Sequence, residues 1–72
     1  MNTAEVYRAT KWLDVAAETY ALEQAYTRFQ VLIEEEGYTD DQKTPSRRLR
    51  KAAVTFLEAE KTFCTLKERA SL

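Results

Sequence analysis

The sequence contains no histidine and only one cysteine, one glycine and one proline among its 72 residues. A lone cysteine cannot close a disulfide within the chain, and a sequence without histidine lacks the usual ligands of a structural zinc site. One glycine is too few for a phosphate-binding loop. We therefore expect no bound metal and no cofactor.

Long apolar runs are also missing. No stretch of the sequence approaches the roughly 18 apolar residues that cross a bilayer, and residues 1–5 lack the charged and apolar parts of a signal peptide. We expect a soluble, cytoplasmic protein that makes no contact with a membrane. The scarcity of glycine and proline, with abundant alanine, glutamate, leucine, lysine and arginine, indicates an all-α fold.

The short chain limits the size of the hydrophobic core. We predict a single domain over residues 1–72, and a domain of this size buries only about 60% of the surface that its unfolded chain exposes. Small domains without disulfides or metals usually gain stability from self-association or from a partner. We therefore expect this domain to complete its core by contact with another chain.

The helix-breaking residues divide the chain once. Gly37 follows Ile33–Glu36 at the position where glycine commonly ends a helix, and Thr44–Pro45 resembles an N-cap followed by proline in the first turn. At the start of the chain, Asn2 with Glu5 three residues later is typical of a helix N-terminus. The sequence therefore predicts two helices joined by one turn.

The predicted helices cover about residues 3–36 and about residues 45–70, and the turn covers about residues 37–44. Residues 1–36 carry three basic and seven acidic side chains, whereas residues 45–72 carry seven basic and three acidic ones. Helices of opposite net charge favour pairing with each other, although each exposed ion pair is worth only about 0–1 kcal/mol. We predict an antiparallel two-helix hairpin.

The apolar residues of the first predicted helix occupy two faces. One face holds Val6, Ala9, Leu13, Ala16, Ala17 and Tyr20, and the other holds Leu22, Ala25, Tyr26, Phe29, Leu32 and Ile33. At 100° per residue these two faces lie about 180° apart. The second predicted helix has one main apolar stripe, formed by Leu49, Ala52, Ala53, Phe56, Ala59, Phe63, Leu66 and Ala70.

A straight helix with apolar residues on opposite sides needs two neighbours, since no proline or glycine near residues 20–22 would bend it. We expect one neighbour to be the second helix and the other to belong to a second chain. The predicted assembly is a homodimeric four-helix bundle. Its core and dimer seam are expected to include Leu22, Tyr26, Phe29, Ile33, Phe56 and Phe63.

A basic run near the start of the second helix contains Arg47, Arg48, Arg50 and Lys51. Four positive side chains in one segment are able to contact nucleic-acid phosphates. The chain as a whole has a net charge of −1, and Glu34–Glu36 is expected to lie nearby. Ion pairs within the hairpin are therefore the favoured interpretation, and docking of an acidic protein surface is a further alternative.

Two aromatic residues are candidates for partner binding. Trp12 lies about a quarter turn away from the Val6–Tyr20 face, and Tyr38 lies in the predicted turn. Exposed aromatic residues often anchor interfaces. Each residue also has a structural alternative: Trp12 in the core, and Tyr38 packed on Ile33 or Leu49 as part of the helix end.

No group of residues suggests catalysis, because Cys64 has no histidine to activate it and a two-helix hairpin encloses little volume for a pocket. We interpret the chain as a non-enzymatic interaction module that binds another protein and inhibits or escorts it. We expect it to be a phage- or plasmid-encoded regulator of a host protein. The alternatives are a nucleic-acid-binding regulator that uses the basic run and a structural or co-chaperone subunit of a larger assembly.

Overall fold

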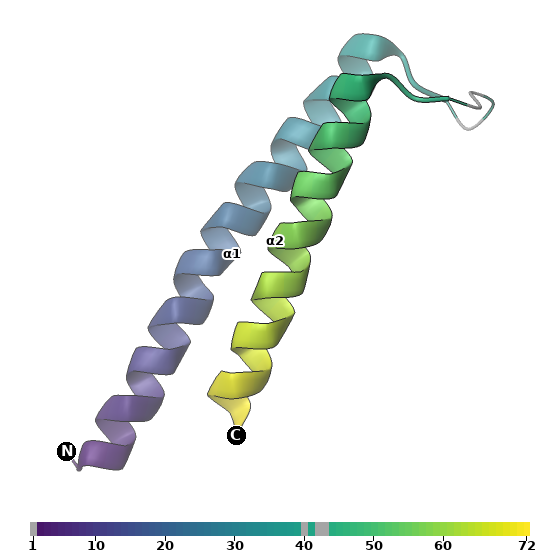
Figure 1. Cartoon of the computed structure of the whole chain (residues 1–72). Helices are drawn as coiled ribbons and strands as arrows, with labels where there is room; N and C mark the ends of the chain where they lie inside the picture. The colour runs from purple at the N-terminus through teal and green to yellow at the C-terminus, as the bar shows by residue number, and fades with distance from the viewer. Residues whose placement is uncertain (1, 40, 42–43) are drawn as a thin grey trace.

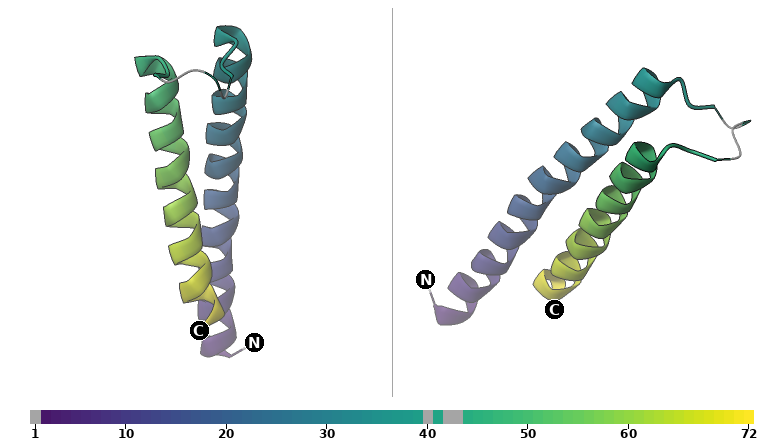
Figure 2. Two further views of the ribbon diagram at one scale, coloured as in Figure 1. Left: turned by 90° about the vertical axis from the view of Figure 1, so that its right-hand side faces the viewer. Right: turned by 45° about the horizontal axis from the view of Figure 1, so that its top comes forward.

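The computed structural model describes residues 2–39, 41 and 44–72. These residues form two helices, α1 over Thr3–Glu36 and α2 over Arg47–Ser71, and no strand occurs among them. The helices run antiparallel and side by side, with the two chain termini toward the same end (Figure 1, Figure 2). The hairpin is a rod with principal extents of 55 × 17 × 16 Å. The predicted all-α helical hairpin is confirmed.

Side-chain caps fix where both helices begin. The Asn2 side chain accepts a hydrogen bond from the backbone N–H of Glu5 at 2.8 Å, as the sequence predicts. In α2 the cap is Ser46, whose hydroxyl oxygen accepts from the N–H of Leu49 at 3.1 Å. The predicted cap at Thr44 is wrong, because Ser46 has an extended backbone and caps the helix, so α2 begins at Arg47, close to the approximate start at residue 45.

The end of α1 is a glycine cap. Gly37 adopts the left-handed conformation with φ of 61°, which a residue with a side chain rarely adopts. Its N–H donates to the carbonyl of Glu34 at 3.2 Å, and the N–H of Tyr38 donates to the carbonyl of Ile33 at 3.1 Å. This pair of hydrogen bonds is the Schellman motif, which satisfies two carbonyls at the helix end and turns the chain out of the helix.

The two helices pack along seams in which shielded residues alternate at spacings of three and four. On α2 the seam consists of Leu49, Ala52, Phe56, Ala59, Phe63, Leu66 and Ala70. On α1 it consists of Lys11, Val15, Glu18, Leu22, Ala25, Phe29, Leu32 and Glu36. An average spacing of 3.5 residues is the coiled-coil repeat. The antiparallel hairpin therefore has the seam spacing of a coiled coil, and its α1 seam contains the charged residues Glu18 and Lys11 toward the N-terminus.

The hydrophobic core is thin. Its buried residues are Val15, Leu32, Leu49, Ala52 and Ala70, and no side chain in the described part of the chain is completely enclosed. Leu32, Leu49 and Ala52 form the main cluster near the connection, where Phe29, Ile33 and Tyr38 pack against it. Two helices alone cannot enclose every seam residue, and Phe56, Ala59, Phe63 and Leu66 on α2 are only half-buried.

The change of apolar face along α1 decides which residues α2 covers. The half of α1 nearest the connection presents the face around Leu22, Phe29 and Leu32 to α2, and these residues are shielded. The face around Leu13 lies on the opposite side of α1 and is exposed. α1 runs without a kink between these two halves (Figure 1). The hairpin therefore covers one of the two predicted faces and leaves the other open.

Candidate protein-interaction surfaces

An uncovered apolar surface lies on the N-terminal half of α1. We call it the outer face, and it consists of Val6, Ala9, Leu13, Ala16, Ala17 and Tyr20. Leu13 and Tyr20 are 68% and 67% exposed, and Val6 is 49% exposed. The residues at 6, 9, 13, 16 and 20 repeat the alternation of three and four seen in the intramolecular seam. The outer face thus has the spacing of a second coiled-coil seam, and no described part of the hairpin covers it.

The residues predicted for the core and dimer seam lie mainly between α1 and α2. Leu22, Phe29, Ile33, Phe56 and Phe63 are half-buried there. Tyr26 is exposed on one side, but its ring lies 5.4 Å from that of Phe56 in a tilted arrangement, and the Phe29 and Phe56 rings are 6.1 Å apart. Tilted ring pairs at these distances are favourable. Contact within the hairpin accounts for these positions, and a part in a dimer stays a prediction.

The structure places the two candidate aromatic residues differently. Trp12 is exposed on the side of α1, beyond the edge of the outer face. Tyr38 is half-buried and packs against the cluster of Leu32, Leu49 and Ala52. Tyr38 therefore packs on the helix end, which is the structural alternative to partner binding. This contact follows from the position of Tyr38 directly after Gly37 in the helix cap. Partner binding by either residue stays a prediction.

The basic run lies close to the acidic end of α1, but few of its charges form pairs. Arg47, Arg48, Arg50 and Lys51 are all exposed. Arg48 Nη2 lies 3.7 Å from Glu35 Oε2, and this is the one ion pair among the residues that the structure describes. Both side chains are more than half exposed, so the pair contributes at most about 1 kcal/mol. The basic run lies near Glu34–Glu36, as predicted, but among the described residues only Arg48 and Glu35 neutralise each other.

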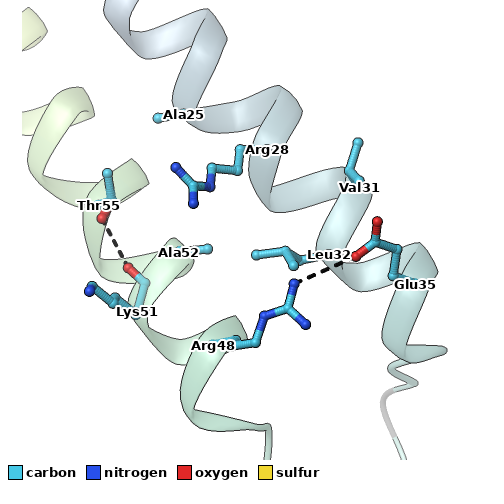
Figure 3. A pocket seen from close by; sticks show the side chains of 9 residues that line it. All are labelled: Ala25, Arg28, Val31, Leu32, Glu35, Arg48, Lys51, Ala52 and Thr55. Carbon is cyan, nitrogen blue, oxygen red and sulfur yellow. Dashed lines mark hydrogen bonds and ion pairs between the residues drawn. The ribbon is translucent and has the colours of Figure 1, made fainter.

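A groove runs along one side of the hairpin between the two helices, near the connection. Its residues come from both helices and are shown in Figure 3: Ala25, Arg28, Val31, Leu32, Glu35, Arg48, Lys51, Ala52 and Thr55. Three of its side chains are basic, and one is acidic. Sequence reasoning found Arg48 and Lys51 but missed Arg28, which is 20 residues away in the chain. Only the antiparallel register brings Arg28 beside the basic run.

A smaller hollow of about 160 Å³ lies on another part of the same end, between Phe29, Ile33, Tyr38, Pro45, Leu49, Arg50 and Ala53. Arg50 and Lys51 are neighbours in sequence but border different hollows. Arg48 and Lys51 therefore face one side of α2, and Arg50 faces another.

The described residues contain no group of three or more histidine, cysteine, aspartate or glutamate side chains placed to hold a metal ion. Cys64 is a free thiol on the surface of α2. Across residues 2–39, 41 and 44–72, neither helix is both long and apolar enough to cross a membrane. No family model, curated protein or solved structure matches the chain.

Proposed function

We propose that this protein is a non-enzymatic interaction module that assembles as a homodimer and binds another protein, which it inhibits or escorts. The observation that carries the proposal is the outer face of α1, where three large apolar side chains stand exposed at regular coiled-coil spacing. Contiguous apolar surface of this kind marks interaction sites in soluble proteins. The thin core of the hairpin supports the same conclusion, because covering the outer face would supply the burial that the hairpin lacks.

The outer face has the symmetry that a homodimer needs. Val6 and Tyr20 each lie seven residues from Leu13, so an antiparallel pairing of two α1 helices about Leu13 places Val6 against Tyr20 of the partner subunit. Ala9 then meets Ala17 of the partner subunit. A parallel pairing would instead stack two valines in one layer and two tyrosines in another. The antiparallel layers have more even volumes, which favours a constant distance between the helices.

The proposed dimer has four helices, with the two α1 helices in contact at its centre. Its two connections point away from each other, and the surfaces near them stay free for a partner. Two 55 Å rods that overlap only around Leu13 give an assembly about 80 Å long. A cytoplasmic regulator encoded by a phage or plasmid is the setting that we propose for it.

Sedimentation equilibrium on the purified chain tests the assembly, and small-angle scattering on the same sample tests its length. We expect a dimer with a maximum dimension near 80 Å. A monomer at concentrations up to about 100 μM, where a specific dimer at the weak end of the usual range would still form, would refute it. Affinity capture from a nuclease-treated lysate then tests the partner: a protein retained after nuclease supports the proposal.

A nucleic-acid-binding regulator is the second candidate, because three of the four residues in the basic run have no ion-pair partner among the described residues. Contacts with phosphates release counterions, so such binding weakens steeply as salt rises. Capture that disappears with nuclease, together with binding to a DNA or RNA duplex that is lost between 50 and about 200 mM salt, would favour this candidate.

A further inference from the structure

The groove beside the connection combines charged and apolar side chains, whereas the outer face is apolar. On α1 the groove extends from Ala25 to Glu35. Ala25 lies twelve residues beyond Leu13, which is about 18 Å along the helix axis. A dimer centred on Leu13 therefore leaves the groove open. The inference below rests on the proposed function as a protein-interaction module and concerns the chemistry of the partner.

The charge of the groove is strongly one-sided. Arg28 from α1 and Arg48 and Lys51 from α2 border the same space, and Glu35 is the one acidic side chain in its lining. Glu35 already pairs with Arg48. Arg28 and Lys51 have no carboxylate within 4.0 Å in the described part of the chain. Figure 3 shows Arg28 reaching from α1 toward α2 across the space between the helices. Within the described residues, the groove thus offers two unpaired cations, one from each wall.

The floor of the groove is apolar and made of small or medium side chains. Ala25 and Leu32 come from α1 and Ala52 comes from α2, and Val31 stands 45% exposed at the edge. Small side chains allow the backbone of a third helix to approach closely. An apolar floor between cationic walls is complementary to a helix that carries an apolar stripe with carboxylates beside it.

We propose that this groove binds an amphipathic α-helix of a partner protein, about three turns long, whose apolar stripe is flanked by aspartate and glutamate side chains. The length follows from the segment of α1 between Ala25 and Glu35, whose five lining residues span about 15 Å along the helix axis. The apolar stripe packs on Ala25 and Val31, which keep accessible surface above the buried Leu32 and Ala52, and the flanking carboxylates pair with Arg28 and Lys51. A nucleic-acid backbone would use the cations but leave Ala25 and Val31 uncovered, so the acidic helix fits more of the surface.

A peptide selection with the whole chain tests this proposal and does not require the partner to be identified first. A displayed library of random 16-residue peptides is selected on the immobilised protein, and the recovered peptides are fluorescently labelled for anisotropy titrations. We expect the recovered sequences to be acidic, with leucine, isoleucine or alanine repeating at spacings of three and four. We also expect the peptides to become helical on binding, as measured by circular dichroism.

Charge-reversal variants then locate the binding site. Lys51→Glu and Arg28→Glu are expected to raise the dissociation constant at least tenfold, because each places a carboxylate opposite those of the peptide. Arg50→Glu is the matched control: it makes the same change of charge on the adjacent residue of α2, outside this groove, and is expected to change binding by less than threefold. Arg28→Gln and Lys51→Gln replace the charge-reversal variants if a reversed charge disturbs the fold, because they remove the positive charge without adding a carboxylate.

Each contrary outcome identifies a different error. Recovered peptides that are neutral or basic, or that respond to Arg50→Glu as strongly as to Lys51→Glu, overturn the groove assignment while leaving an interaction module intact. Loss of the dimer in Arg28→Glu and Lys51→Glu shows that a second copy occupies the groove, which also overturns the proposal. Recovery of no peptide, while a 20-base-pair DNA duplex binds, overturns both this inference and the proposed function.

Discussion

Truncating one exposed leucine gives a direct test of the outer face. Complete burial of a leucine side chain contributes about 1.5–3 kcal/mol, and Leu13 keeps 68% of its surface exposed in the hairpin. Covering it in a dimer would therefore contribute about 1–2 kcal/mol, and alanine would lose about three-quarters of that amount. A two-fold dimer contains the residue twice, so Leu13→Ala is expected to cost about 1.5–3 kcal/mol. The dissociation constant of the dimer then rises about 10- to 150-fold.

The measurement is sedimentation equilibrium at several protein concentrations, with circular dichroism to confirm that the helices remain. Leu57→Ala is the matched control, because Leu57 is 58% exposed on α2 and lies outside the outer face. We expect Leu57→Ala to leave the dissociation constant within about twofold of the unmodified chain, since substitutions at exposed sites without contacts usually have small effects. Equal effects of both variants, or a dimer unaffected by Leu13→Ala, would refute the assignment of the seam.

Three further predictions concern the stability of the hairpin, measured by thermal or urea unfolding followed by circular dichroism. Leu32→Ala should destabilise the protein by about 2–5 kcal/mol, because Leu32 is buried in the main cluster, and a smaller loss than 1 kcal/mol would contradict the observed packing. Ser46→Ala should cost about 1 kcal/mol through loss of the α2 cap, whereas Thr44→Ala should cost less than half as much; the reverse order would restore Thr44 as the cap. Gly37→Ala should cost about 1 kcal/mol because of the left-handed backbone at Gly37, and an unchanged or higher stability would mean that this conformation is not kept in solution.

Much of the fold follows from local sequence signals. Asn2 and Gly37 mark the ends of α1 without ambiguity, because the cap residue and the helix pattern agree at each position. The start of α2 is harder to predict, since Thr44–Pro45 and Ser46 each satisfy the rules for a helix start within three residues. In the structure the backbone of Ser46 is extended, so α2 starts after Ser46. Local rules cannot separate such closely spaced alternatives.

The candidate surfaces were predictable only where they lie within one helix. The outer face follows from the periodicity of α1 alone, and the basic run is contiguous in the sequence. The groove depends on how far the two helices slide past each other, which sets Arg28 beside Lys51. The expected contact of Tyr38 with a partner competes with a contact to the helix end, and the choice between them depends on the route of the chain after Gly37. The apolar periodicity of a single helix predicts neither the register of the two helices nor the route of the chain after Gly37.

The alternation of three and four along both seams also sets the units in which this hairpin can change length during evolution or in design. Removing seven residues from α1 and seven from α2, at matching levels of the rod, returns every remaining seam residue to the same side of its helix and shortens the rod by about 10 Å. Removing one residue instead rotates everything beyond it by about 100° and turns the seam away from its partner. Relatives of this protein that keep its architecture are therefore expected to differ in rod length by paired steps of seven residues.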